Sequence, residues 1–140
     1  MKIASDAILA AKQNHHFLSV HKTGQVAIVP TSGNNDCHII LRGGKDAPNY
    51  DADSVNAACL ELKKAGLPER VMIDLSHGNC LGDYRKQLDS GASVARQIAL
   101  GDHRITGVMI ESNLVEGRQS PSPDTPQVFG QSITDACLGW

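Results

Sequence analysis

Residues 71–77 read VMIDLSH, an apolar run that ends in a histidine, and this pattern decides the fold class. Two further runs have the same form: HIIL at 38–41 leads into Arg42, and GVMI at 107–110 leads into Glu111. Short apolar runs of this kind are typical of buried parallel strands. In parallel α/β folds, functional side chains gather at the carboxyl ends of such strands. We therefore expect Arg42, His77 and Glu111 to face one shared pocket.

Helix-like stretches separate the three runs, so the sequence predicts parallel βαβ units. One helix is expected over about 54–65 with Asp53 as its cap, and another over about 84–100 with Asp83 as its cap. A helix over 2–13 and a hairpin of residues 17–20 and 25–29 precede the first buried strand. The polar, proline-containing stretch 116–130 is expected to be a long loop.

The predicted architecture is incomplete. Three parallel strands alone would leave two unpaired edges and a largely uncovered sheet. No helical pattern follows the last apolar run. The sequence thus predicts an α/β chain that forms the second half of a larger barrel, a single partial domain over 1–140 with an inserted hairpin and without its final helix.

Composition narrows the classes of partner and the compartment. The net charge of −2 gives no electrostatic case for binding nucleic acid or membranes. The four cysteines form no C-x-x-C pair, and no apolar stretch approaches the roughly 18 residues of a membrane span. The amino terminus has no signal-peptide layout, so a cytoplasmic protein is expected.

Three residues form a candidate metal site. His77 and Glu111 each end an apolar run, and Asp135 lies in the short β-prone piece SITD at 132–135. A histidine with two carboxylates is a common ligand set for Mn²⁺, Fe²⁺, Co²⁺ or Zn²⁺. Each residue has a plainer interpretation: a structural histidine, a salt bridge of Glu111 to a lysine or arginine, and Asp135 as the cap of a helix from Ala136.

Arg42 is a candidate for a different role, because Gly43 and Gly44 follow it directly. A guanidinium at a strand end, beside open glycine backbone, suits the binding of a phosphate or carboxylate. A salt bridge at the rim of the barrel explains the same arginine equally well. The two cysteines nearest these loops, Cys80 and Cys137, could approach a metal, but they are more simply small buried residues.

Four stretches carry a resemblance to a known family: GNNDCHIILRGGKDAPNY at 33–50, VMIDLSHGN at 71–79, GVMIESNLVEGRQS at 107–120 and SITDACLGW at 132–140. They closely resemble the class I 3-deoxy-D-arabino-heptulosonate 7-phosphate (DAHP) synthases, also called phospho-2-dehydro-3-deoxyheptonate aldolases. The likeness covers nearly the whole chain and corresponds to the carboxyl-terminal half of such an enzyme. A sibling family that makes an eight-carbon sugar acid phosphate fits these stretches less well.

The resemblance implies the carboxyl-terminal half of a (β/α)₈ barrel and a metal-dependent transferase that opens the shikimate pathway to chorismate and the aromatic amino acids. Such enzymes condense phosphoenolpyruvate with erythrose 4-phosphate. It implies that His77, Glu111 and Asp135 are metal ligands and that Arg42 contacts phosphoenolpyruvate. It also makes Phe17, Ser19 and Val29 candidates for an aromatic amino acid effector site, although a hairpin packing face explains them as well. A homo-oligomer is a further possibility, and no catalytic residue is assigned.

The departures from the family pattern concern the missing half. The fourth metal ligand of the family is a cysteine on the first barrel strand, and the main phosphate-binding segment, Lys-Pro-Arg-Thr, also belongs to that half. We therefore expect the isolated chain to be inactive. Two alternatives are a non-catalytic half-barrel that serves as an association module, and an enzyme rebuilt from two chains.

Overall fold

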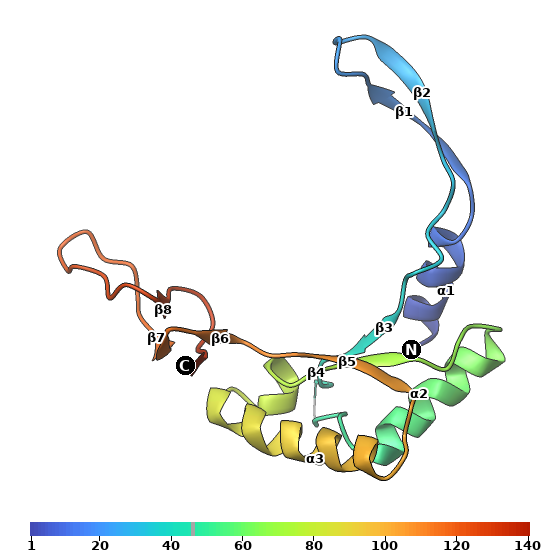
Figure 1. Cartoon of the computed structure of the whole chain (residues 1–140). Helices are drawn as coiled ribbons and strands as arrows, with labels where there is room; N and C mark the ends of the chain where they lie inside the picture. Colours follow the sequence, from blue (N-terminus) through green and yellow to red (C-terminus); the bar gives the residue numbers. More distant parts are fainter. Residues whose placement is uncertain (46) are drawn as a thin grey trace.

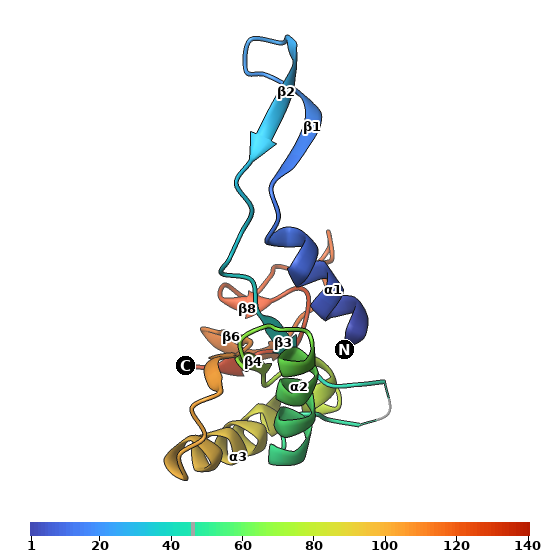
Figure 2. The ribbon, with the colours of Figure 1, turned by 90° about the vertical axis from the view of Figure 1, so that its right-hand side faces the viewer.

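The computed structural model describes residues 1–45 and 47–140. Asp46, which falls within the stretch GNNDCHIILRGGKDAPNY, lies outside the described residues. The chain forms a crescent with a three-stranded parallel sheet at its middle (Figure 1), and Figure 2 shows the same ribbon turned by 90°. One arm of the crescent is an extended hairpin, and the other is formed by the carboxyl-terminal segment.

The central sheet has the order β3-β4-β5, and all of its strands are parallel. Strand β3 spans Ile39–Leu41, β4 spans Val71–Asp74 and β5 spans Ile105–Met109. Helix α2 (Ala52–Lys64) joins the first two strands, and α3 (Gln87–Ala99) joins the last two. The expected βαβ order is confirmed, so the carboxyl ends of the three strands lie at one edge of the sheet.

Both helices cover the same face of the sheet, the lower face in Figure 1. Helix α2 buries Val55, Cys59 and Leu62, which follow helical spacing, so one apolar stripe faces the strands. The alternate residues Val71 and Ile73 of β4 are fully buried beneath this stripe. Burying each large aliphatic side chain contributes about 1.5–3 kcal/mol, so this layer holds the sheet and helices together.

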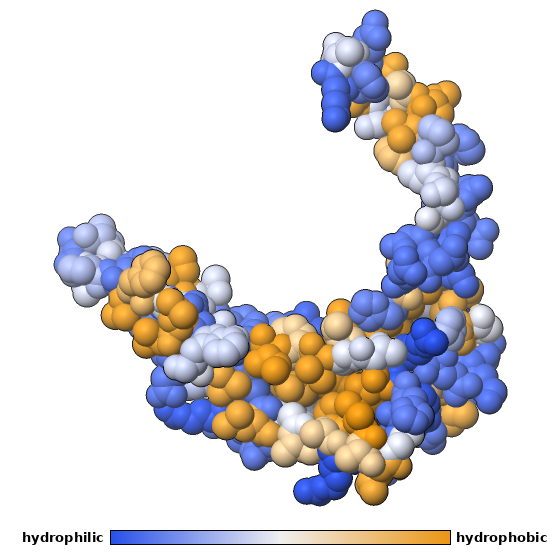
Figure 3. Space-filling view, viewed as in Figure 1, coloured by the Kyte–Doolittle hydropathy of each residue, from blue (hydrophilic) through white to orange (hydrophobic). Residues whose placement is uncertain are grey.

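The opposite face of the sheet is apolar but open. Ile40 of β3 is 49% exposed, Val108 of β5 is 43% exposed, and Ile110 just beyond β5 is 48% exposed. Figure 3 shows apolar surface over the middle of the crescent, where the central sheet lies. In a complete α/β domain both faces of a parallel sheet are covered, and here one is not.

The start of α2 corrects one sequence prediction. Asp51, rather than Asp53, is the cap: its backbone is extended, and its carboxylate accepts hydrogen bonds from the Ser54 backbone N–H at 2.9 Å and the Ser54 hydroxyl at 2.6 Å. Asp53 lies inside the first turn. The side-chain hydrogen bond from Ser54 is the largest influence on the Asp51 carboxyl and lowers its pKa. Both aspartates lie near the start of this helix in the sequence, and only the extended backbone at Asp51 shows which of them is the cap.

The remaining elements lie at the ends of the chain. Helix α1 (Lys2–Ala11) leads into the antiparallel hairpin of β1 (His15–Val20) and β2 (Val26–Thr31), which is longer than expected. Beyond β5 come four short strands: β6 (Ser112–Asn113), β7 (Val115–Arg118), β8 (Gln131–Ser132) and β9 (Leu138–Gly139). Residues 112–140 contain no helix, so the interpretation of Asp135 as a helix cap is wrong.

Two shorter features complete the description. The helix expected from about residue 84 begins with a 3-10 turn at Tyr84–Lys86, which Asp83 caps by accepting a hydrogen bond from the Arg85 backbone N–H. The α-helix itself starts later, at Gln87, and its N-cap residue Lys86 makes no side-chain capping hydrogen bond. In the described part of the chain, no helix is both long and apolar enough to cross a membrane.

Candidate metal centre

The site begins at the end of β4, where the backbone turns sharply. Asp74 is the last residue of the strand, and His77 opens the 3-10 turn His77–Cys80 with φ of +48°. A positive φ in a residue other than glycine costs about 1–3 kcal/mol and is concentrated at functional sites. This strained turn directs the His77 ring toward the ends of the neighbouring strands.

Glu111 reaches the same place from β5. Its backbone is held by the buried amide of Gln87: the Glu111 N–H donates to Gln87 Oε1 at 2.8 Å, and Gln87 Nε2 donates to the Glu111 carbonyl at 3.1 Å. The carboxylate is held as well, because the Ser76 hydroxyl donates to Glu111 Oε2 at 2.8 Å. Glu111 is therefore fixed at both its backbone and its side chain.

Asp135 is brought in by the short strands of the carboxyl-terminal segment. The Leu138 N–H donates to the Glu111 carbonyl at 3.0 Å, and Cys137 pairs with Gly117 in an isolated bridge. These contacts place the Asp135 carboxylate beside His77, although its side chain remains 66% exposed. Residues 24 positions apart in the sequence thus meet at one edge of the sheet.

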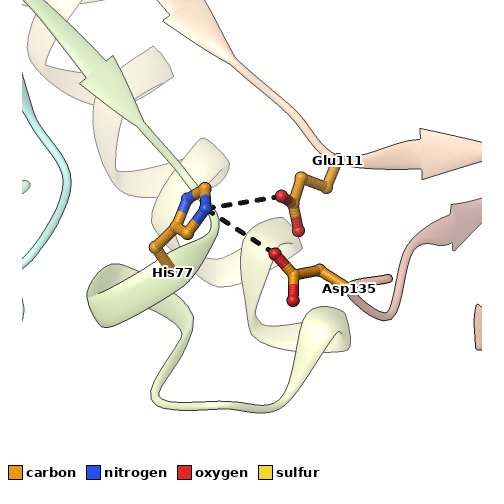
Figure 4. A group of neighbouring side chains, drawn as sticks. All are labelled: His77, Glu111 and Asp135. Atoms are coloured by element: carbon orange, nitrogen blue, oxygen red, sulfur yellow. Dashed lines mark ion pairs between the residues drawn. The ribbon is translucent and has the colours of Figure 1, made fainter. Parts of the chain in front are cut away.

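The three side chains converge on one point, as Figure 4 shows. His77 Nε2 lies 3.5 Å from Glu111 Oε1 and 3.9 Å from Asp135 Oδ2, and one ligand atom from each residue lies within 4.8 Å of the others. Ligands about 2.1 Å from a metal at tetrahedral angles are about 3.4 Å apart. The His77–Glu111 separation already matches that value, and the exposed Asp135 side chain would have to move closer to complete the set.

The charge balance of the group also fits a cation. Over residues 1–45 and 47–140, the His77 ring lies within 4.0 Å of the carboxylates of both Glu111 and Asp135, and no lysine or arginine pairs with either. The alternative interpretation of Glu111 as part of a salt bridge to a lysine or arginine is therefore wrong for this part of the chain. Two clustered carboxylates without such a partner favour a bound cation, and an imidazole with two carboxylates suits a divalent transition metal.

A small pocket of about 140 Å³ opens beside the three ligand atoms. Its lining includes Cys80 and Tyr84. The Cys80 thiol donates to the His77 carbonyl at 3.3 Å, so in this structure it supports the turn. The pocket has room for a small group on the metal-facing side of His77.

Arg42 follows β3 at the same edge of the sheet, and its side chain is exposed. The two glycines after it do not supply open backbone, which corrects the sequence interpretation. The Gly43 N–H donates to Asn49 Oδ1 at 2.7 Å, and the Gly44 N–H donates to the Ala47 carbonyl at 2.8 Å. A Cβ on Gly43 would lie 2.3 Å from the carbonyl carbon of Gly78, so Gly43 serves the close approach of two loops.

The proposed effector residues lie together on the hairpin of β1 and β2, which extends away from the central sheet in Figure 1. Phe17 and Val29 are direct cross-strand partners, and Ser19 follows two residues later on the same face. Val29 and Ser19 are half-buried, and Phe17 is 49% exposed. The predicted grouping is geometrically consistent, while its role in binding stays a prediction.

Sequence reasoning missed the residues that support the ligands: Asp74, Ser76, Gln87 and Asn79. A signal existed for Asp74, which is a charged residue inside an otherwise apolar strand. Gln87 is 1% exposed, and its role depends on a contact with a residue 24 positions away. No local pattern around Gln87 predicts that contact.

Comparison with known proteins assigns the chain to a family. The family model described as "DAHP synthetase I family" matches residues 1–140. The chain belongs to this family. It is 57% identical over 140 residues to the Phe-sensitive phospho-2-dehydro-3-deoxyheptonate aldolase of Escherichia coli K12, and 54% identical to the phospho-2-dehydro-3-deoxyheptonate aldolase of Haemophilus influenzae.

Each match covers the whole of this chain. It covers only 40% of the Escherichia coli relative and 39% of the Haemophilus influenzae relative. A solved structure of phospho-2-dehydro-3-deoxyheptonate aldolase from Francisella tularensis superposes with a TM-score of 0.91 at 45% identity, over 99% of this chain and 40% of that one. The chain is therefore a fragment relative to these enzymes, spanning about two fifths of their length.

Proposed function

We propose that this chain is the carboxyl-terminal part of a DAHP synthase, which condenses phosphoenolpyruvate with erythrose 4-phosphate in a metal-dependent reaction. The group formed by His77, Glu111 and Asp135 carries the proposal, because it combines a metal-suited donor set with membership of the DAHP synthetase I family. The proposal includes a partial (β/α)₈ barrel as the single domain of residues 1–140, the first step of the shikimate pathway, and a cytoplasmic location.

One set of residues would bind a metal cation, and a separate arginine would bind the anionic substrate. His77 Nε2 and the carboxylates of Glu111 and Asp135 would hold a divalent ion, with Mn²⁺, Fe²⁺, Co²⁺ and Zn²⁺ all compatible with such donors. When bound, such an ion supplies Lewis-acid polarisation of the sugar aldehyde. Arg42, at the neighbouring strand end, would bind the anionic groups of phosphoenolpyruvate and orient its reactive carbon toward that aldehyde.

The open sheet face indicates that this chain needs the rest of the enzyme for activity. Exposed Ile40, Val108 and Ile110 lie on the side of the sheet that a barrel would enclose. Three ligands and one arginine do not position two phosphorylated substrates at once, and such positioning supplies much of the rate enhancement. We therefore expect little or no activity from the isolated chain.

The same open face supports one alternative function, that of a non-catalytic association module. An apolar patch of this kind marks an interaction site or an aggregation liability. In that case the chain would bind a partner or form a homo-oligomer through the patch, whether or not the metal ligands are intact.

The hairpin adds a regulatory proposal. Relatives of this chain include aldolases named Phe-sensitive and Trp-sensitive, at 57% and 53% identity. Phe17, Ser19 and Val29 share one face of the hairpin, and an aromatic amino acid could pack there against Phe17. Both kinds of sensitivity occur at comparable identity, so the choice of effector is left to measurement.

The test is phosphate release from phosphoenolpyruvate and erythrose 4-phosphate with Mn²⁺. The chain is assayed alone and after mixing with the part of the Escherichia coli Phe-sensitive enzyme that it does not match. We expect metal-dependent release only in the mixture, lost on His77→Ala and retained in His103→Ala, which removes an exposed histidine. A folded mixture that binds Mn²⁺ but releases no phosphate would support the association module instead.

A further inference from the structure

Asp74 is a buried carboxylate that the proposed chemistry does not use directly. It is 3% exposed at the end of β4, and a buried charge is costly unless it is paired and hydrogen-bonded. Both of its oxygens are engaged: Oδ1 accepts from the Ser76 backbone N–H at 2.9 Å, and Oδ2 lies 2.7 Å from His77 Nδ1. The residue is therefore fixed against the ring of a proposed metal ligand.

We propose that Asp74 is a positioning residue that selects the tautomer of His77 and aims its free nitrogen at the cation. A carboxylate only accepts hydrogen bonds, so the hydrogen of neutral His77 resides on Nδ1. Nε2 then keeps its lone pair, and this is the atom that lies 3.5 Å from Glu111 Oε1. Metal-bound histidines commonly donate their other nitrogen to a carboxylate in this way.

The backbone around Asp74 is arranged to keep this contact. The Asp74 carbonyl accepts a 2.6 Å hydrogen bond from Asn79 Nδ2, which also donates to the Leu41 carbonyl at 3.1 Å. Together with the bond from Ser76, this closes the turn that holds His77 at positive φ. Asp74 thus supports both the ring and the strained backbone that carries it.

Asp74→Asn tests the proposal with little change of shape. An amide has one oxygen, and the Ser76 N–H needs an acceptor, so the amide NH₂ is left facing His77 Nδ1. That arrangement moves the imidazole hydrogen to Nε2 and blocks the metal-facing lone pair. In wild type, ¹⁵N–¹H spectra of the metal-free chain on the alkaline side of a pH series should show Nδ1–H.

In Asp74→Asn the Nε2–H form should appear, and Zn²⁺ affinity should fall by about 10- to 100-fold. Asp102→Asn is the matched control, since it alters a partly buried carboxylate paired with Arg104 Nη2 at 2.8 Å, away from His77. It should change neither the His77 spectrum nor Zn²⁺ affinity. An Nε2–H tautomer in wild type would overturn the proposal without any variant, even if Asp74→Asn fails to fold.

The inference rests on the proposed metal function, and the two can fail separately. Wild type that shows Nδ1–H but binds no Zn²⁺ would support the selection of the tautomer by Asp74 and overturn the metal centre in this chain. Wild type that binds Zn²⁺ while Asp74→Asn binds it equally well would overturn the role of Asp74 and leave the metal centre standing.

Discussion

Replacing Gly43 with alanine would force apart the loops that follow β3 and β4. Gly43 has φ of +89°, and an added Cβ would lie 2.3 Å from the carbonyl carbon of Gly78 and 2.5 Å from the backbone nitrogen of Asn79. All of these neighbours are backbone atoms, so no flexible side chain can move aside. Gly78 directly follows His77 in the turn after β4. A substitution that displaces Gly78 therefore also displaces the backbone that holds the proposed metal ligand.

The magnitude follows from two separate costs. A positive φ costs a residue with a Cβ about 1–2 kcal/mol. Non-bonded carbons pack at about 3.5 Å or more, so the loops must separate by about 1 Å. That displacement breaks the 2.7 Å bonds from Gly43 N–H to Asn49 Oδ1 and from Asn49 N–H to Asn79 Oδ1. At about 1 kcal/mol each, they bring the total loss of stability to about 3–4 kcal/mol.

Gly24 supplies a matched control for the same assay. Its φ is +84°, and nothing lies within 4 Å of an added Cβ, so Gly24→Ala carries the conformational cost alone. Urea unfolding followed by far-UV circular dichroism should show Gly43→Ala less stable than Gly24→Ala by about 2 kcal/mol. Equal stabilities, within about 0.5 kcal/mol, would refute the reasoning that close loop approach is what requires glycine at this position.

Three further outcomes are expected. Leu62→Ala should lower the free energy of unfolding by about 2–5 kcal/mol, because Leu62 is 1% exposed. Leu60 is 46% exposed, so Leu60→Ala should lower that free energy far less. Equal losses in denaturant titrations would contradict the assigned core. Asp51→Ala should cost about 1 kcal/mol at neutral pH through loss of the cap. The lowered pKa of Asp51 means that its contribution is present above the ordinary value of 3.8 and lost as pH falls below it, so the variant and wild type should converge in stability at low pH. Gln87→Met should weaken Zn²⁺ binding measured by calorimetry, since both hydrogen bonds to the Glu111 backbone are lost, and unchanged affinity would show that Glu111 is held by other contacts.

The strands of the central sheet could be predicted from the sequence because the apolar patterns that mark them extend over only a few neighbouring residues. The run VMID at 71–74 is apolar and bounded, and the structure has it as β4. The last central strand was expected at 107–110 but begins earlier, at Ile105, because Ile105 pairs with Val71 across the sheet. Strand β7 was missed entirely within a polar stretch, since it exists through pairing with Gln131 and Ser132.

The sequence by itself determined the alternation of strands and helices, and with it the edge at which His77 and Glu111 end their runs. Spacing and polarity suffice for that, because they act over a few residues. Only the tertiary structure decided how those side chains are held: Asp74 against His77 Nδ1, Ser76 and Gln87 against Glu111, and Gly43 against Gly78. The physical reason is that a buried polar group must find a partner wherever the fold provides one, and that partner is often distant in the chain.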